Sequence, residues 1–126
     1  MPTHLPIERH HAGKRMSDIV VFKPAGERLV YLAGQVAEDA TADIEDQARS
    51  VLKRIDALLA EVGSDKTHIL SATIYLANIK DFALMNTVWD AWVPQGHTPA
   101  RATVEASLAN PAYKIEIQIV AAAPAA

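Results

Sequence analysis

The chain has 126 residues, of which 50% are hydrophobic and 21% are charged, and these values are typical of one soluble globular domain rather than of a disordered chain. It contains no cysteine, which excludes thiol nucleophiles, disulfides and cysteine-based metal sites. The formal net charge of −3, from 12 basic and 15 acidic side chains, argues against nucleic acid as a partner, because such a chain has no general attraction for phosphate.

The sequence contains no segment typical of membrane insertion or secretion. A Lys, Arg, Asp or Glu interrupts every apolar run of the body before it reaches the ~18 residues of a transmembrane helix. Residues 1–11 contain no apolar block of the kind found in secretory signals. We therefore expect a cytoplasmic protein with no membrane partner. We also expect one domain over residues 1–126, with residues 1–14 as a loosely ordered N-terminal segment.

The N-terminal half of the chain predicts strands followed by a helix. A short strand is expected around residues 7–11. Residues 19–22 and 29–32 are β-branched and aromatic, and turn residues separate them, which predicts a β-hairpin. From residue 43 to residue 62 the apolar positions advance in steps of three and four, and Gly63 follows. This pattern predicts a helix that ends at the glycine.

The C-terminal half predicts a strand, a second helix and two further strands. Residues 69–77 are rich in strand-forming side chains, and Asp81 is a suitable N-cap for a helix over 82–93. Residues 101–106 and 114–122 alternate apolar and polar side chains, as strands do. This order of elements predicts an α+β fold with one mixed sheet and both helices on one of its faces. The opposite face of the sheet is then not covered by helices. The side chains on that face decide whether the protein functions as a monomer or together with other chains.

The last two strands carry the candidate chemistry. If they are neighbours with Arg101 opposite Glu116, then Thr103 lies opposite Lys114 and the polar side chains share one face. That face is either simply solvated, with an ion pair worth about 0.2–1 kcal/mol, or it is a site. In a site, the guanidinium of Arg101 would bind a carboxylate, and the carboxylate of Glu116 would orient water or carry a proton. Periodicity alone does not choose between these interpretations.

Other residues give no indication of a metal or cofactor. His10 and His11 are adjacent, so on a strand they point to opposite faces and do not hold one ion together. Without cysteine or a His-x-x-x-His spacing, no metal site is expected. No glycine-rich phosphate loop occurs, so a nucleotide cofactor is unsupported. Trp89 and Trp92 have the spacing of a packed helical stripe, and we interpret them as core or subunit contacts rather than a platform for bases.

Five short segments carry a resemblance that extends from about residue 15 to residue 122. They are residues 33–36 (AGQV), 72–76 (ATIYL), 81–86 (DFALMN), 99–106 (PARATVEA) and 114–117 (KIEI). Together they resemble, in the same order, the RidA family, also called YjgF or reactive intermediate deaminase, of the endoribonuclease L-PSP superfamily. The Pro-Ala-Arg run with a Glu fifteen positions after the Arg is the most specific motif. Residues 15–18 and 89–92 resemble the YoaB-like branch more than the archetypal deaminases.

The resemblance implies a chorismate-mutase-like fold and a homotrimer with a cleft between each pair of subunits. It also implies hydrolysis of small 2-imino or 2-enamino acids to 2-keto acids and ammonia, with no metal or cofactor. By the same resemblance, Arg101 would hold the substrate carboxylate and Glu116 would position the attacking water. The backbone around Gly34 and Thr103 would complete the substrate-binding pocket.

Two positions of this pocket depart from the archetypal motif. Met16 stands where the archetype has Tyr, and Ala33 stands where it has Ser, so both hydroxyl groups are missing. A pocket built around a hydroxyl discriminates strongly through it, so either the substrate differs or hydrolysis is slow. The alternative functions are a non-catalytic trimer that binds small carboxylates, a ribonuclease and a holdase chaperone. The acidic balance of the chain argues against RNA.

Overall fold

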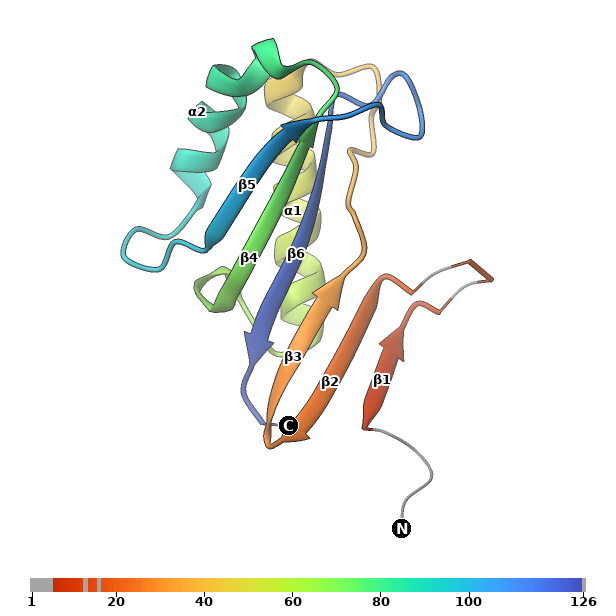
Figure 1. The fold of residues 1–126 in the computed structure, drawn as a ribbon, viewed down its shortest axis with the longest axis vertical. Helices are drawn as coiled ribbons and strands as arrows, with labels where there is room; N and C mark the ends of the chain where they lie inside the picture. Colours follow the sequence, from red (N-terminus) through yellow and green to blue (C-terminus); the bar gives the residue numbers. More distant parts are fainter. Residues whose placement is uncertain (1–5, 13, 16, 126) are drawn as a thin grey trace.

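A computed structural model describes residues 6–12, 14–15 and 17–125 of the chain, which form one sheet and two long helices (Figure 1). In chain order the elements are β1 (Ile7–His10), β2 (Ile19–Ala25), β3 (Glu27–Leu32), α1 (Ile44–Glu61), β4 (Ile69–Leu76), α2 (Phe82–Trp92), β5 (Ala100–Glu105) and β6 (Ile115–Ala123). Short 3₁₀ turns precede β4 and α2. No helix in the described part of the chain is long and apolar enough to span a membrane.

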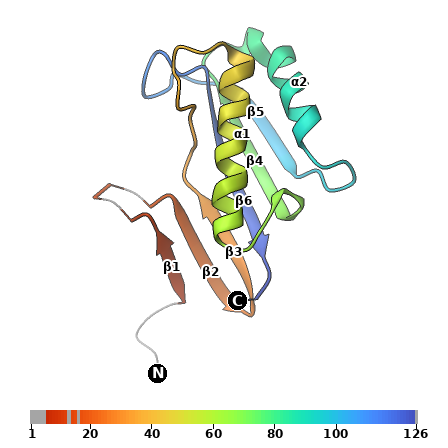
Figure 2. The same cartoon turned by 180° about the vertical axis from the view of Figure 1, so that it is seen from behind.

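The six strands form a single mixed sheet in the order β1-β2-β3-β6-β4-β5. β4 and β5 run parallel, and all other neighbouring strands are antiparallel. Both helices lie on the same face of this sheet, α1 across its centre and α2 beside it toward β5 (Figure 2). The predicted α+β fold, with helices on one face and the other face open, is therefore confirmed.

The core lies between the sheet and α1. The buried side chains of α1 follow the predicted steps of three and four, and they are Ile44, Gln47, Ala48, Val51, Leu52, Ile55, Leu58 and Leu59. Full burial of one such aliphatic side chain contributes roughly 1.5–3 kcal/mol. Asp43 is the N-cap of this helix, and its side chain accepts a hydrogen bond from Asp46 N at 2.8 Å. The helix ends before Gly63, which has a positive φ of 76°, a conformation that glycine adopts without strain.

The buried polar side chain of Gln47 fixes the segment that leads into β6. Gln47 Nε2 donates to the carbonyls of Ala40, Ala42 and Ala112 at 3.1–3.2 Å. Gln47 Oε1 accepts from the N–H of Lys114 at 2.9 Å. Because Lys114 directly precedes β6, this one side chain ties α1 to the start of the strand that carries Glu116.

The predicted pairing of the last two strands is wrong. β4 lies between β5 and β6, so Arg101 pairs with Ala72 and Glu116 pairs with Tyr75. The reason is topological: a strand, a crossover helix and a second strand form parallel neighbours, and β4, α2 and β5 are such a unit. The loop over residues 106–114 then carries the chain across to the other side of β4 (Figure 1).

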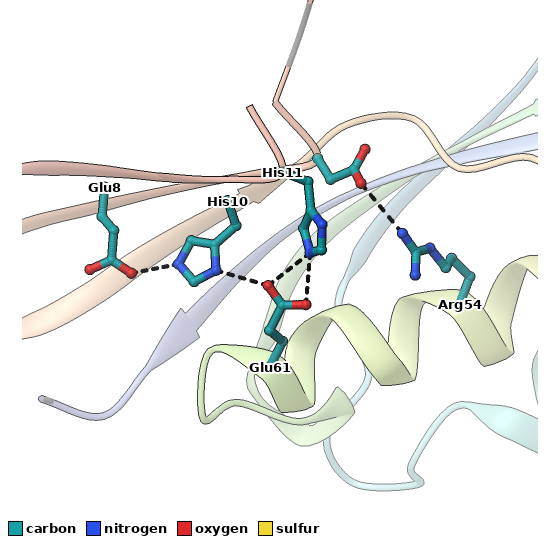
Figure 3. A network of polar contacts seen from close by, with 6 residues as sticks. Glu8, His10, His11, Arg54 and Glu61 are labelled. Atoms are coloured by element: carbon teal, nitrogen blue, oxygen red, sulfur yellow. Dashed lines mark hydrogen bonds and ion pairs between the residues drawn. The ribbon is translucent and has the colours of Figure 1, made fainter. Parts of the chain in front are cut away.

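The N-terminal strand is tied to α1 by a polar network (Figure 3). His10 Nδ1 and His11 Nε2 lie 2.9 Å and 2.8 Å from the carboxylate of Glu61, and His10 Nε2 contacts Glu8. The expectation that the two histidines point apart is wrong here, because His11 has a φ of 54° and leaves the strand conformation. Hydrogen bonds with Glu61 and Glu8 raise the pKa of His10. Hydrogen bonds with His11 and His10 lower the pKa of Glu61.

Candidate functional site

The predicted site residues lie in two groups on opposite faces of the sheet. Paired residues of neighbouring strands point to the same face, and Arg101 and Thr103 pair with the buried residues Ala72 and Ile74 beneath the helices. Glu116 alternates with buried isoleucines of β6 and therefore points to the open face. A single chain thus holds the guanidinium and the carboxylate on different sides of its own sheet.

The first group surrounds the guanidinium of Arg101. Arg101 Nη1 donates to Oδ1 of Asn86 on α2 at 2.9 Å. The guanidinium carbon lies 5.4 Å from the ring centroid of Trp89 and 5.9 Å from that of Phe82. Within the described residues no carboxylate lies within ion-pair distance of Arg101. The cross-strand ion pair expected for a merely solvated face is therefore absent, and the charge of Arg101 is held without being neutralised.

Thr103 belongs to the same group. It lies two residues after Arg101 on the same face of β5, and its Oγ1 is buried with no hydrogen-bond partner in the described part of the chain. A buried hydroxyl without a partner costs about 1–3 kcal/mol, and such groups are rare in folded proteins. The hydroxyl of Thr103 is therefore suited to bind a polar group that approaches Arg101.

The second group surrounds the carboxylate of Glu116. A pocket of about 330 Å³ lies on this face of the sheet. Its lining residues are Gly34, Tyr75, Ala106, Ser107, Leu108, Ala109, Glu116 and Gln118. A Cβ atom at residue 34 would overlap the carboxylate of Glu116. The absence of a Cβ at this position thus lets the carboxylate of Glu116 lie against the backbone of Gly34, and the pocket combines a carboxylate with exposed backbone.

The loop at Gly34 is fixed to β6 by backbone hydrogen bonds. Gln35 N donates to Ile117 O at 2.9 Å, and Ile117 N donates to Gln35 O at 3.0 Å. The side chain of Gln35 donates to the carbonyl of Ala33 at 2.9 Å. Ala33 directly precedes Gly34 but is not among the residues that line the pocket, and Met16 lies outside the described residues.

Some neighbours of the site were not among the predicted site residues, and they include Phe82, Asn86, Trp89 and Tyr75. Asn86 and Trp89 follow Phe82 by four and seven positions, a spacing that places all three on one face of a helix. That spacing is the signal in the sequence that α2 presents a polar acceptor between two aromatic rings. Nothing in the sequence pattern alone pairs Tyr75 with Glu116.

The described residues contain no group of three or more His, Asp or Glu side chains arranged to hold a metal ion. Two larger grooves, of about 570 Å³ and 420 Å³, lie along α1 and between α1 and α2. Neither is lined by Arg101, Thr103 or Glu116. The candidate chemistry therefore rests on the two groups of residues on β5, β6 and α2.

Comparisons with known proteins identify relatives of this chain. The family model described as Endoribonuclease L-PSP matches residues 11–123. The RutC family protein YoaB of Escherichia coli K12 is 48% identical over 118 residues, which cover 94% of this chain and 99% of that protein. A 2-iminobutanoate/2-iminopropanoate deaminase of Rattus norvegicus is 29% identical over 101 residues, covering 75% of this chain and 73% of that protein.

Solved structures show the same fold. NMB1025 of Neisseria meningitidis, a member of the YjgF protein family, superposes with a TM-score of 0.88 at 46% identity, covering 98% of this chain and 99% of that chain. An uncharacterized protein of Pseudomonas aeruginosa superposes with a TM-score of 0.86 at 43% identity, covering 93% and 98%. The sequence motifs, the fold and these relatives together establish that this chain belongs to the RidA/YjgF family, whose family model is Endoribonuclease L-PSP.

Proposed function

We propose that the protein hydrolyses small 2-imino or 2-enamino acids to 2-keto acids and ammonia at a site formed between two copies of the chain. The observation that carries the proposal is the position of Arg101 and Glu116 on opposite faces of one sheet. A small substrate cannot touch both side chains of the same chain, but it can lie between the Arg101 face of one copy and the Glu116 face of the next. A homotrimer with three such clefts meets this requirement.

Arg101 binds the substrate carboxylate in this proposal. A guanidinium presents five N–H donors in a planar fork, and two of them match the two oxygens of a carboxylate. Asn86 accepts from Nη1 only, which leaves donors on Nε and Nη2 for the substrate. Thr103 Oγ1, which is buried and has no hydrogen-bond partner among the residues that the structure describes, adds a hydrogen bond to the same ligand.

Glu116 handles the protons of the reaction. Its carboxylate takes a proton from a water molecule as the water oxygen bonds to the C=N carbon. The proton then passes to the nitrogen, which gives a carbinolamine. The same carboxylate takes the proton of the carbinolamine hydroxyl and delivers it to the amino nitrogen, so that the C–N bond breaks and ammonia leaves as the carbonyl forms. A positioned acid or base of this kind contributes about 10²–10⁴-fold to the rate. The backbone at Gly34 lies beside this carboxylate because residue 34 has no Cβ.

A second candidate function is the binding of small carboxylates without catalysis. The observation that favours it is Ala33, which gives the pocket beside Gly34 no hydroxyl side chain at that position. A transition state with a developing charge on nitrogen or oxygen then loses one hydrogen-bond partner. The name of the rat relative, which is 29% identical, supports the deaminase as the first candidate.

The test couples an amino-acid oxidase, which releases imino acids, to semicarbazide, which traps them. Wild-type protein should reduce the amount of trapped imine. Arg101→Ala should lower kcat/KM by the equivalent of about 2–5 kcal/mol, and Arg101→Lys should recover only part, because an ammonium lacks the planar fork. Glu116→Gln should retain binding of 2-oxobutanoate but slow hydrolysis about 10²–10⁴-fold.

Matched controls lie on the exposed side of α1. Arg49→Ala and Glu45→Gln remove charges that pair with each other on one helix, so both variants should behave as wild type. If wild-type protein competes for imines no better than Arg101→Ala, the deaminase proposal is wrong. Binding of 2-oxobutanoate that is lost in Arg101→Ala would then support the carboxylate-binding function instead.

A further inference from the structure

The guanidinium of Arg101 is held by an unusual set of neighbours for an arginine. One amide oxygen, from Asn86, accepts a hydrogen bond, and two aromatic rings, from Trp89 and Phe82, lie within 5.4 Å and 5.9 Å of the guanidinium carbon. A carboxylate in this place would hold the arginine but would also neutralise it. An amide and two rings hold it and leave its positive charge available.

Asn86 and the two aromatic rings restrain the guanidinium in different ways. The hydrogen bond to Asn86 fixes one nitrogen of the guanidinium but permits rotation of its plane about that bond. Aromatic faces attract a guanidinium through their quadrupole and through stacking, so two rings restrict that rotation. Phe82, Asn86 and Trp89 follow one another by four and three residues on α2, and this spacing directs them to one side of the helix.

The two rings differ in how firmly the fold holds them. Trp89 is only 5% exposed and belongs to the core. Its ring packs 5.4 Å from that of Trp92, whose Nε1 donates to Asp56 on α1 at 3.0 Å. Phe82 is 41% exposed at the start of α2. Trp89 is therefore the firmly packed ring beside the guanidinium, and Phe82 is the ring nearer to solvent.

We propose that Trp89 and Phe82 act as positioning residues that set the plane of the Arg101 guanidinium for binding a carboxylate. The inference rests on the proposed function, because it assigns the carboxylate to Arg101. A guanidinium whose plane is already set loses less freedom when the ligand binds, and affinity increases for that reason. The rings should thus affect ligand binding and KM more than the chemical step, which belongs to Glu116.

Titration with 2-oxobutanoate, followed by calorimetry, tests this inference. Trp89→Leu should weaken binding about 5- to 30-fold, the effect of a lost cation–π contact at a shielded site. Trp89→Phe keeps an aromatic face and should bind within about 3-fold of wild type. Val88→Ala is the matched control. It removes buried volume from the same helix but leaves both aromatic rings beside Arg101 in place, so it should leave the affinity unchanged. In the hydrolysis assay, Trp89→Leu should raise KM with little change in kcat.

A spectroscopic measurement keeps the inference testable should Trp89→Leu fail to fold. Trp92→Phe leaves Trp89 as the sole tryptophan, and 2-oxobutanoate should then change its fluorescence, with the change lost when Arg101→Ala is added. Phe82→Leu, at an exposed position, should weaken binding about 3-fold.

Wild-type affinity in folded Trp89→Leu, or in Phe82→Leu, would overturn the inference, as would a fluorescence change that persists with Arg101→Ala. The two proposals fail separately. If Arg101→Ala abolishes binding while the ring variants do not affect it, the proposed function stands and the positioning role is wrong. If Arg101→Ala binds 2-oxobutanoate as wild type does, the carboxylate site itself is wrong.

Discussion

The absence of a Cβ atom at Gly34 decides where the carboxylate of Glu116 can lie. Its backbone does not have a positive φ, so glycine is needed there for space and not for conformation. Gly34→Ala should push the end of a flexible side chain aside, at a cost of less than about 1 kcal/mol in the free energy of unfolding. Displacement of the carboxylate should lower kcat/KM about 10²-fold. Urea denaturation and the semicarbazide assay measure the two effects.

Gly26→Ala is the control with the opposite pattern. Gly26 has a φ of 110° and open space around its Cα, so an added Cβ strains the backbone by about 1–2 kcal/mol without touching either group of site residues. The variant should lose stability and keep activity. Equal activity of Gly34→Ala and wild type would contradict the role given to the Gly34 backbone.

At the scale of residues, a specific sequence motif identified Arg101 and Glu116 as candidates. The prediction of which face each side chain lies on, and of which residues surround it, was wrong. Alternation along a strand tells which of its own residues share a face, and it does not tell which face that is. The polar side of β5 faces α2 and the polar side of β6 faces the open side, so the two side chains separate. Asn86, the partner of Arg101, stands in residues 81–86, a segment that was used only for the family resemblance and was given no role in the site.

At the scale of elements, Gln47 joins α1 to the entry of β6. Gln47→Leu keeps the size of the side chain but leaves the N–H of Lys114 and three carbonyls without their partner. We expect a loss of about 2–3 kcal/mol in the free energy of unfolding, measured by urea denaturation. Arg49→Leu, on the exposed side of the same helix, should change it by less than about 0.5 kcal/mol. A transition of Gln47→Leu at the wild-type urea concentration would show that the loop does not depend on this side chain.

The network between β1 and α1 makes the attachment of the N-terminal strand depend on pH. The pKa of His10 is raised from 6.5 by Glu61 and Glu8, so its stabilisation is complete below about pH 6.5 and is lost as the pH rises through the raised value. The pKa of Glu61 is lowered from 4.5 by His11 and His10, so its stabilisation is present above about pH 4.5 and is lost as the pH falls through the lowered value.

The attachment should therefore be strongest between about pH 4.5 and 6.5. The measurement is the difference in Tm between wild type and Glu61→Gln across the pH range, which should be largest in this window and decrease toward pH 8. Asp18, which pairs with Arg54 in the same region at 3.3 Å, provides the control: the difference between wild type and Asp18→Asn should not decrease between pH 6.5 and 8. A Glu61→Gln difference that is constant with pH would contradict the network.

Most helices and strands could be predicted because their apolar side chains recur at the clear spacing of a helix or of a strand. The helices, the hairpin and the strand over 69–77 are all present, and the short strand expected around residues 7–11 is β1. The hairpin strands extend further than predicted, since a register shift lets β2 continue to Ala25 and the turn is made at Gly26 alone. Asp81 stands at the N-cap of α2 as expected, but its side chain makes no capping hydrogen bond.

At the scale of the whole molecule, the open face of the sheet bears on assembly. Tyr31 and Val104 are each 44% exposed on the open face of the sheet. A homotrimer would cover such side chains, so light scattering at micromolar concentration should give about three times the mass of one chain. Val104→Glu should reduce this mass, because a charge resists burial at an interface. Ala60→Glu, on the exposed side of α1, should not reduce it, and a single-chain mass for wild type would contradict the trimer.

The strand order was the part of the fold that the sequence could not supply. Two strands joined by a nine-residue loop are compatible with direct pairing or with an intervening strand, and local patterns do not distinguish these arrangements. The insertion of β6 between β3 and β4 depends on contacts between residues far apart in the chain. With this strand order, Arg101 and Glu116 lie on opposite faces of the sheet and not on one face as predicted.

The separation of Arg101 and Glu116 on the two sides of a sheet has a consequence for mixtures of damaged chains. Arg101→Ala and Glu116→Gln chains are each expected to form inactive assemblies. When they are refolded together, every mixed trimer of the proposed kind would contain one cleft that takes an intact Arg101 from one kind of chain and an intact Glu116 from the other. Random mixing in a cyclic trimer would restore about a quarter of the wild-type clefts. Two inactive alleles expressed in one cell would then complement each other, whereas a site contained within one chain would yield no recovery at any mixing ratio.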